Sequence, residues 1–334
     1  MHFVNRTPFP GCALPSVAPD DSHLIVVVVK GTFGLNAGAA VIAEEPVPIH
    51  AEDVYSGAPG LSSLRYEADT AVAKPGTDIA LVGSAYAPDG RPVRRLDVGI
   101  KVGRAAKIVR VCGDREWRRA RGGFELTEPA PFTTMPLVYE NAYGGADPVD
   151  PSRGRDDRNP VGKGYASDAS LQELERIAAP NIELRERPIG SITERPAPAG
   201  LGFVARHWQP RRALAGTYDD AWREQRCPLL PLDFDPRSYA AASTGLTTDG
   251  HLGGGEPVAL VNVSREGRSE FALPARSLVV TASIAGRRIE QPLQLDTVVL
   301  EPDERRVMLT WRAALPCHWN LAMVDWIRVN DRDG

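Results

Sequence analysis

The carboxylates are the first residues in this sequence that could do chemistry. Asp233 and Asp235 stand one residue apart in the segment LPLDFDPRSY, and Glu140 lies far upstream. Paired aspartates can supply the oxygen ligands that a divalent cation prefers, and two carboxylates across a cleft can cleave a glycosidic bond. The same pair also suits an Asx turn that starts a helix at Pro236. No third acidic residue follows at the spacing of a metal loop, so we expect the turn and no metal site.

A glycine-rich stretch between Tyr139 and Tyr165 is the second candidate, and it reads YENAYGGADPVDPSRGRDDRNPVGKGY. A Walker A loop needs a first glycine where this chain has Asp157, and Ser or Thr where it has Gly164. A dinucleotide fingerprint needs a strand before the glycines, whereas a charged loop precedes them here. We therefore expect an ordered structural or protein-contact loop and no cofactor.

Histidine and serine motifs give no positive sign of catalysis. The six histidines form no HxH or HExxH pair, and no GxSxG segment is present. We therefore expect a protein that is not an enzyme. The alternative is a hydrolase or carbohydrate-active enzyme that uses Glu140 with Asp233 or Asp235 as paired carboxylates in the middle region.

Aromatic residues recur beside arginines along the chain. The groups are Arg115/Trp117/Arg118, Trp208/Arg211/Arg212, Tyr218/Trp222/Arg223, Trp311/Arg312 and Trp326/Arg328. These residue types dominate the hot spots of protein interfaces, but they also stack on ordinary β surfaces, and we weigh the two interpretations evenly. Acidic residues interleave the groups and the net charge is −4, so we expect no binding to nucleic acid.

Composition indicates a globular protein rich in turns. Hydrophobic residues make up 43% and charged residues 25% of the 334 residues, and the 31 glycines and 29 prolines are spread along the chain. The longest apolar run, Leu24 to Val29, is too short to cross a bilayer, and the N-terminal residues do not resemble a signal peptide. We expect a cytoplasmic protein that does not enter a membrane.

Strand-length segments fill residues 1–142 and 256–334. The β-branched run Leu24–Phe33 is typical of a buried strand, and Asp89-Gly90 is a hairpin turn signal. This pattern predicts a mainly β protein with antiparallel sheets in a sandwich or barrel-like arrangement. We expect residues 1–334 to form one domain.

The middle region, residues 143–255, is rich in Pro, Gly and Arg and predicts two short helices. A capping box at Ser170 indicates a helix that Pro180 ends, and Thr217 indicates a second helix that ends before Pro228. So long an irregular region in a compact domain indicates a binding surface or an insertion.

Ten motifs follow one another in order along the sequence. They are KGTF, KPGTDIALVGSAYAPDGRPV, GDREW, FTTMPLVYENAYGG, RNPVGKGY, PNIELRERPI, HWQPRRALAGTYDDAW, CPLLPLDFDPRSYAAAS, GGGEPVALVNVSREG and LDTVVLEPDERRVMLTWRA. They are spread from Lys30 to Ala313, and on these motifs the chain resembles, over nearly its whole length, domain-of-unknown-function family 2169.

This resemblance implies a bacterial adaptor, or chaperone, of the type VI secretion system. Such proteins help to load a PAAR-containing effector onto the VgrG spike and are themselves not secreted. The implied partners are therefore a PAAR-domain effector and the VgrG spike, and the resemblance supplies no catalytic residue. A structural component of the secretion particle is a further alternative.

Residue types in the middle region and in the GDREW motif give the candidates for partner contact or loop anchoring. Glycine accepts a positive φ without a Cβ clash, and proline fixes φ, so such a loop can be ordered without a helix or strand. The candidates are Arg115, Trp117, Glu140, Tyr143, Gly144, Gly145, Asn159, Pro160, Gly162, Gly164, Arg211 and Trp222.

Overall fold

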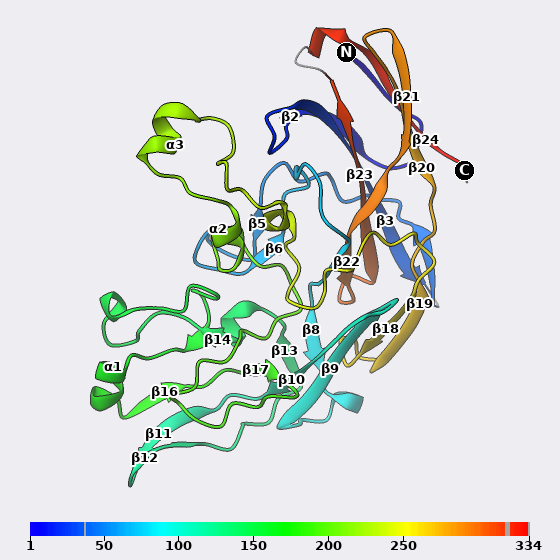
Figure 1. The fold of residues 1–334 in the computed structure, drawn as a ribbon. Helices are drawn as coiled ribbons and strands as arrows, with labels where there is room; N and C mark the ends of the chain where they lie inside the picture. The colour runs from blue at the N-terminus through cyan, green and yellow to red at the C-terminus, as the bar shows by residue number, and fades with distance from the viewer. Residues whose placement is uncertain (37, 318–320, 333–334) are drawn as a thin grey trace.

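The computed structural model describes residues 1–36, 38–317 and 321–332, which fold mainly into β-sheets (Figure 1). Within these ranges the α-helices are short: α1 (Asp168–Glu173), α2 (Arg211–Leu214) and α3 (Asp220–Gln225). Among the described residues, no helix is long and apolar enough to span a membrane.

The largest sheet has six strands and joins the two ends of the sequence. Its order is β2-β3-β23-β22-β7, and β4 pairs with β3. The bounds are β2 Gly11–Val17, β3 His23–Asn36, β4 Ala39–Ile42, β7 Asp78–Leu81, β22 Gln294–Glu301 and β23 Arg306–Pro316. Neighbours are antiparallel except β22 and β7, which are parallel. The centre of β3 is buried on both faces, which explains its continuous run of valines.

A four-stranded sheet brings the chain ends together at one end of the molecule (Figure 1). Its order is β1-β24-β20-β21, with β1 His2–Asn5, β24 Val324–Asp331, β20 Leu278–Ile284 and β21 Arg287–Pro292. The strands β1 and β24 are parallel, and the other pairs are antiparallel.

A five-stranded antiparallel sheet combines segments from all three regions of the sequence. Its order is β17-β10-β9-β18-β19. The bounds are β9 Arg95–Val102, β10 Ala105–Cys112, β17 Ile182–Leu184, β18 Pro257–Val261 and β19 Arg268–Ala272. One hydrophobic core runs through this sheet and the six-stranded sheet, with Val98, Leu260 and Leu309 among its members.

Short ladders order the remaining strands. A three-stranded sheet has the order β12-β11-β16, with β11 Glu116–Ala120, β12 Gly123–Leu126 and β16 Arg176–Ala178. Three further ladders have two strands each: β5 Val54–Tyr55 with β6 Leu64–Tyr66, β8 Ser84–Tyr86 with β13 Thr134–Pro136, and β14 Tyr143–Gly144 with β15 Lys163–Gly164. A second, smaller core lies here, and its buried members are Trp117, Tyr143, Ala166, Leu171, Ile177, Ala179, Ile189 and Ile192.

The predicted class, a mainly β protein with antiparallel sheets, is confirmed, and each described sheet is open. The turn at Asp89-Gly90 is also present, with φ of 54° and 66°. It does not close a hairpin, however, because β8 before it pairs with β13 rather than with β9. The turn chemistry was correct, but the partner of the strand depends on packing over a longer range.

The helices differ in detail from the prediction. The cap of α1 is Ser167, whose hydroxyl accepts from the amide of Ser170, and the helix ends at Glu173. Residues 176–178 then form β16, because they complete the ladder with β11 and bury Ile177 in the second core. The cap of α3 is Asp219 rather than Thr217, and the additional helix α2 was not predicted.

Candidate functional site

The glycine-rich loop is built around the buried side chain of Asn159. Its amide nitrogen donates to the carbonyl oxygens of Tyr139 at 2.8 Å and Tyr143 at 3.0 Å. Its backbone oxygen accepts from the amides of Gly145 at 2.8 Å and Gly162 at 3.2 Å. One residue therefore ties the two ends of the loop together, and β14 and β15 form a short parallel ladder beside it.

Two positions of this loop require glycine because another backbone segment passes too close to leave room for a Cβ atom. At Gly144, φ is 148° and an added Cβ would lie 2.1 Å from the oxygen of Asn159. At Gly145, φ is 91° and an added Cβ would lie 2.3 Å from the oxygen of Gly162. Pro160 lies in the turn that follows Asn159, and Gly164 pairs with Gly144. The amides of Gly145, Gly162, Lys163 and Tyr165 bond to backbone oxygens of the same loop, so the arrangement braces the chain.

Glu140 and Tyr143 also anchor the loop. The Glu140 carboxylate accepts from the backbone amide of Ser63 at 2.8 Å and from the Ser63 hydroxyl. The same hydroxyl accepts from the amide of Tyr139 at 2.8 Å. The ring of Tyr143 is buried in the second core, where burial raises the pKa of its hydroxyl.

Trp117 belongs to the second core, and Arg115 precedes it by two residues. The Arg115 guanidinium donates to the oxygen of Pro180 at 3.0 Å and to Glu183 at 2.7 Å, and both charged side chains are buried. Trp117 is 4% exposed and packs in the same core as Tyr143. Neither side chain is available to a partner in this conformation.

Arg211 belongs to a buried charge cluster that the sequence interpretation missed. The cluster consists of the cations Lys30, Lys74, Arg211 and Arg312 and the anions Glu67, Asp69, Asp78 and Asp296. Four positive and four negative charges balance one another. Balance matters here because an uncompensated buried charge is costly.

Lys74 is the hub of one half of this cluster. Its ammonium lies 2.7 Å from Glu67 and 2.7 Å from Asp78, and Arg211 lies 2.5 Å from the other oxygen of Glu67. Burial opposes the charged form of Glu67, but Lys74 and Arg211 outweigh it and lower the pKa of this carboxyl group. Asp78 also accepts from the amide of Ala241 at 2.7 Å. This half thus fastens β7 to the middle region.

Arg312 is the hub of the other half. Its guanidinium donates to the backbone oxygens of Asp69, at 3.1 Å, and Ala71. Its Nε lies 2.9 Å from Oδ2 of Asp296, but the N–H bond is not directed at that oxygen, so the attraction is Coulombic. Burial raises the pKa of Asp296.

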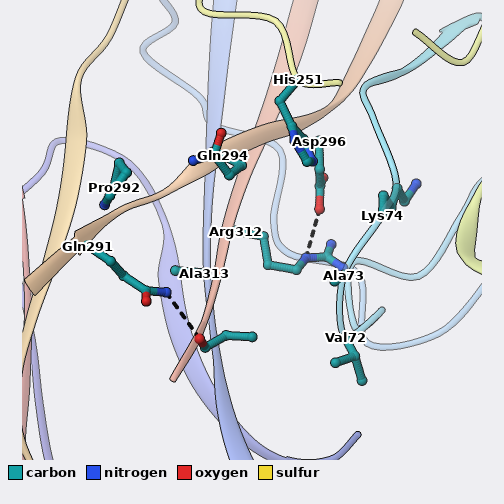
Figure 2. A pocket seen from close by; sticks show the side chains of 11 residues that line it. Val72, Ala73, Lys74, His251, Gln291, Pro292, Gln294, Asp296, Arg312 and Ala313 are labelled. Carbon is teal, nitrogen blue, oxygen red and sulfur yellow. Dashed lines mark hydrogen bonds and ion pairs between the residues drawn. The ribbon is translucent and has the colours of Figure 1, made fainter. Parts of the chain in front are cut away.

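Three members of the cluster, Lys74, Asp296 and Arg312, line a cavity of about 340 Å³ (Figure 2). Asp296 and Arg312 face each other on one side, and the amide of Gln291 donates to the oxygen of Ala314 at 3.1 Å on another. The lining also includes Val72, Ala73, Lys74, His251, Pro292, Gln294 and Ala313. Because its charges are compensated within the wall, we interpret the cluster as the framework that joins β22 and β23 to the preceding loops.

Trp222 lies on a segment that we call the arm, residues 216–235. None of the six residues of α3 is buried, and α3 stands away from the sheets (Figure 1). Tyr218 is 51% exposed and Leu232 is 87% exposed. The rings of Tyr218 and Trp222 meet edge to face at 4.7 Å, and the indole nitrogen of Trp222 donates to the oxygen of Leu229 at 2.8 Å.

Two contacts hold the arm in place, one within it and one to the rest of the protein. At its base, Asp233 accepts from the amide of Thr217 at 2.9 Å and from its hydroxyl at 2.8 Å. Farther out, both terminal nitrogens of Arg226 bond to the carboxylate of Asp21 at 2.6 and 2.7 Å. The arm is thus ordered but projects most of its side chains to solvent.

The carboxylates of the enzyme alternative each bond within their own surroundings. Glu140 bonds to Ser63, Asp233 to Thr217, and Asp235 pairs with Arg237 at 2.5 Å. Asp235 also caps the short helix that begins at Pro236, which confirms the turn that the sequence predicted. The described residues contain no group of three or more His, Cys, Asp or Glu placed to hold a metal ion.

The predicted residues therefore fall into three places. The second core and its surroundings contain the residues of the glycine-rich loop, together with Glu140, Tyr143, Arg115 and Trp117. Arg211 lies in the charge cluster and Trp222 lies on the arm. The missed cluster did leave a signal in the sequence. Lys30 and Asp296 interrupt β-branched or apolar runs, and such charges need partners.

Comparisons with known proteins give a family. No curated protein and no solved structure matches the chain. A family model described as an uncharacterized protein conserved in bacteria matches residues 20–312. The chain therefore belongs to this bacterial family, DUF2169.

Proposed function

We propose that this protein is a non-catalytic adaptor that binds a PAAR-containing type VI secretion effector in the bacterial cytoplasm and assists its loading onto the VgrG spike. The identity of the partner follows from the resemblance described for the sequence. The observation that carries the binding role is the arm, which presents Tyr218 and Leu232 to solvent on an ordered support.

An apolar segment of the effector is the partner chemistry that suits the arm. An aliphatic side chain that is 87% exposed and a half-exposed tyrosine gain free energy when a partner covers them, at about 25 cal/mol per Å² of apolar surface. The arm needs no rearrangement for this, because Arg226 and Thr217 already hold it in place. Preorganisation of this kind reduces the entropic cost of binding.

Co-expression with a PAAR-containing effector of the same bacterium tests the proposal. We expect the two proteins to co-purify, and the effector to be less soluble when expressed alone. Leu232→Ser should weaken the complex. Leu61→Ser is the control and should not weaken it, because Leu61 is 79% exposed but lies outside the arm. Absence of a complex with the wild-type protein, or equal effects of the two substitutions, would count against this function or against the arm as its site.

A further inference from the structure

Lysine is rare in this protein, and one lysine has unusual surroundings. The chain has five: Lys30, Lys74, Lys101, Lys107 and Lys163. The first two are paired with buried carboxylates, and Lys101 is exposed on β9. Lys163 donates to the side-chain oxygen of Asn181 at 2.6 Å. Lys107 has hydroxyl and carbonyl neighbours instead.

The side chain of Lys107 lies on the inward face of β10. Side chains two residues apart on a strand lie on the same face of the sheet, so Lys107 shares its face with Val109 and Val111. Both valines are fully buried, whereas Lys107 is half-buried. Its Nζ donates to the hydroxyl of Ser243 at 2.6 Å and to the backbone oxygen of Thr244 at 3.0 Å. In the described part of the chain, no carboxylate forms an ion pair with it.

Polar groups around Lys107 do not compensate a positive charge fully. The hydroxyl of Tyr139 bonds to the same Ser243, and burial raises the pKa of this tyrosine to about 12. Tyr139 is therefore neutral at physiological pH. Burial lowers the pKa of Lys107 to about 8. An ordinary lysine is almost fully protonated near pH 7.5, so a much larger fraction of Lys107 is the neutral amine at that pH.

We propose that Lys107 is an acylation site, at which its Nζ accepts an acyl group from an acyl thioester. The neutral amine attacks the thioester carbonyl carbon, and a carbon–nitrogen bond forms as the carbon–sulfur bond breaks. The thiolate leaves and takes up the proton that the nitrogen loses, which yields an amide and a free thiol. Oxidants and reductants are not needed for this step.

The surroundings of Lys107 suit the product as well as the reaction. An amide at this position keeps one N–H, which can donate to the oxygen of Thr244, and its carbonyl oxygen can accept from the hydroxyl of Ser243. Acylation also removes the charge, so the protein no longer has to desolvate an ammonium group on the inward face of β10. This site lies on β10, apart from the arm, so the proposal stands independently of effector binding.

Mass spectrometry of the intact, folded protein treated with the acetyl thioester of N-acetylcysteamine tests the proposal. We expect acetylation of Lys107 to be at least about tenfold faster than that of exposed Lys101 near pH 7.5, because neutral amines are the reactive form. In concentrated guanidinium chloride the two rates should become similar. Equal rates in the folded protein would overturn the proposal.

A carboxylate placed near the amine provides a second test. Thr244→Asp, at an exposed position, should restore the charged form and slow the acetylation of Lys107 towards the rate of Lys101. Thr134→Asp, at an exposed position on β13, is the matched control and should leave the rate unchanged. Equal rates in Thr244→Asp and wild type would show that the missing carboxylate is not the cause of the reactivity, and would overturn that part of the argument.

Discussion

Arg211 and Glu67 form a buried ion pair at 2.5 Å, although 144 positions separate them in the sequence. The pair joins α2 in the middle region to the loop before β7. Arg211 further donates to the oxygens of Val204 at 2.7 Å and Ser238 at 3.0 Å. Each of its three guanidinium nitrogens thus donates to a partner inside the protein, which assigns Arg211 to the framework rather than to an exposed contact surface.

Removal of Arg211 should destabilise the fold strongly. Arg211→Met leaves the cluster with one excess negative charge and three backbone or carboxylate acceptors without their donor, so we expect a loss of about 3–5 kcal/mol in the free energy of unfolding. Urea denaturation monitored by circular dichroism measures it. Arg237→Met breaks the exposed pair with Asp235 and serves as the control, with an expected loss below about 1 kcal/mol. Similar losses for both variants would contradict the framework role.

Local chemistry accounts for what the sequence could predict. The valine run of β3, the turn at Asp89 and the cap at Asp235 each depend on residues a few positions apart, and the structure contains all three. The pairing of β8 with β13 and the ion pair of Arg211 with Glu67 depend on segments that meet only in the folded chain.

The candidate site was predictable to a smaller extent for the same reason. Trp and Arg side by side in sequence can be buried, as at Trp117, or exposed on a projecting segment, as near Trp222, and the local pattern is the same. Lys30 and Asp296 are charged residues inside apolar segments, and this position does predict that each has a buried partner of opposite charge. Single-sequence reasoning cannot say which partners these are, because the ion pairs span large sequence separations.

Asn159 should be essential to the order of the glycine-rich loop. Asn159→Asp replaces a donor that serves two buried carbonyl oxygens with a carboxylate, so we expect a loss of about 3 kcal/mol or more. Hydrogen exchange should quicken most at the amides of Gly145 and Gly162, which bond to Asn159. Asn141→Ala, which removes a solvent-exposed bond to Pro136, should leave these amides protected. Unchanged protection in Asn159→Asp would refute the anchoring role.

Asp147 should make the stability of the protein fall in acid. Burial raises the pKa of its carboxyl group, but bonds from Ser170, Ser167 and Asp150 outweigh burial and hold the pKa well below its usual range. The folded state therefore binds the proton less readily than the unfolded state. Its contribution is present above about pH 4, the unfolded pKa, and is lost as pH falls towards the folded pKa.

Denaturation of Asp147→Asn as a function of pH measures this contribution. The variant should be less stable than the wild type at pH values above about 5, and the difference should shrink as pH falls below about 4. Asp249→Asn, at an exposed position, is the control. A difference that stays constant across this pH range would mean that the ionised carboxylate of Asp147 is not the stabilising species.

The tether between Arg226 and Asp21 should control the arm without controlling the fold. Arg226→Ala removes two bonds to Asp21 and one to the oxygen of Leu230, but none of the residues of α3 contributes a buried side chain. We therefore expect faster proteolytic cleavage within residues 216–235 and a loss of about 1 kcal/mol or less in the free energy of global unfolding.

The control is Arg223→Ala, which loses only an exposed pair with Asp220 and should be cleaved at the wild-type rate. If the arm is the surface that holds the effector, loosening it should weaken the complex through the entropy of ordering it again, even though Tyr218 and Leu232 are unchanged. Wild-type cleavage together with wild-type binding in Arg226→Ala would show that the tether has no part in presenting the arm.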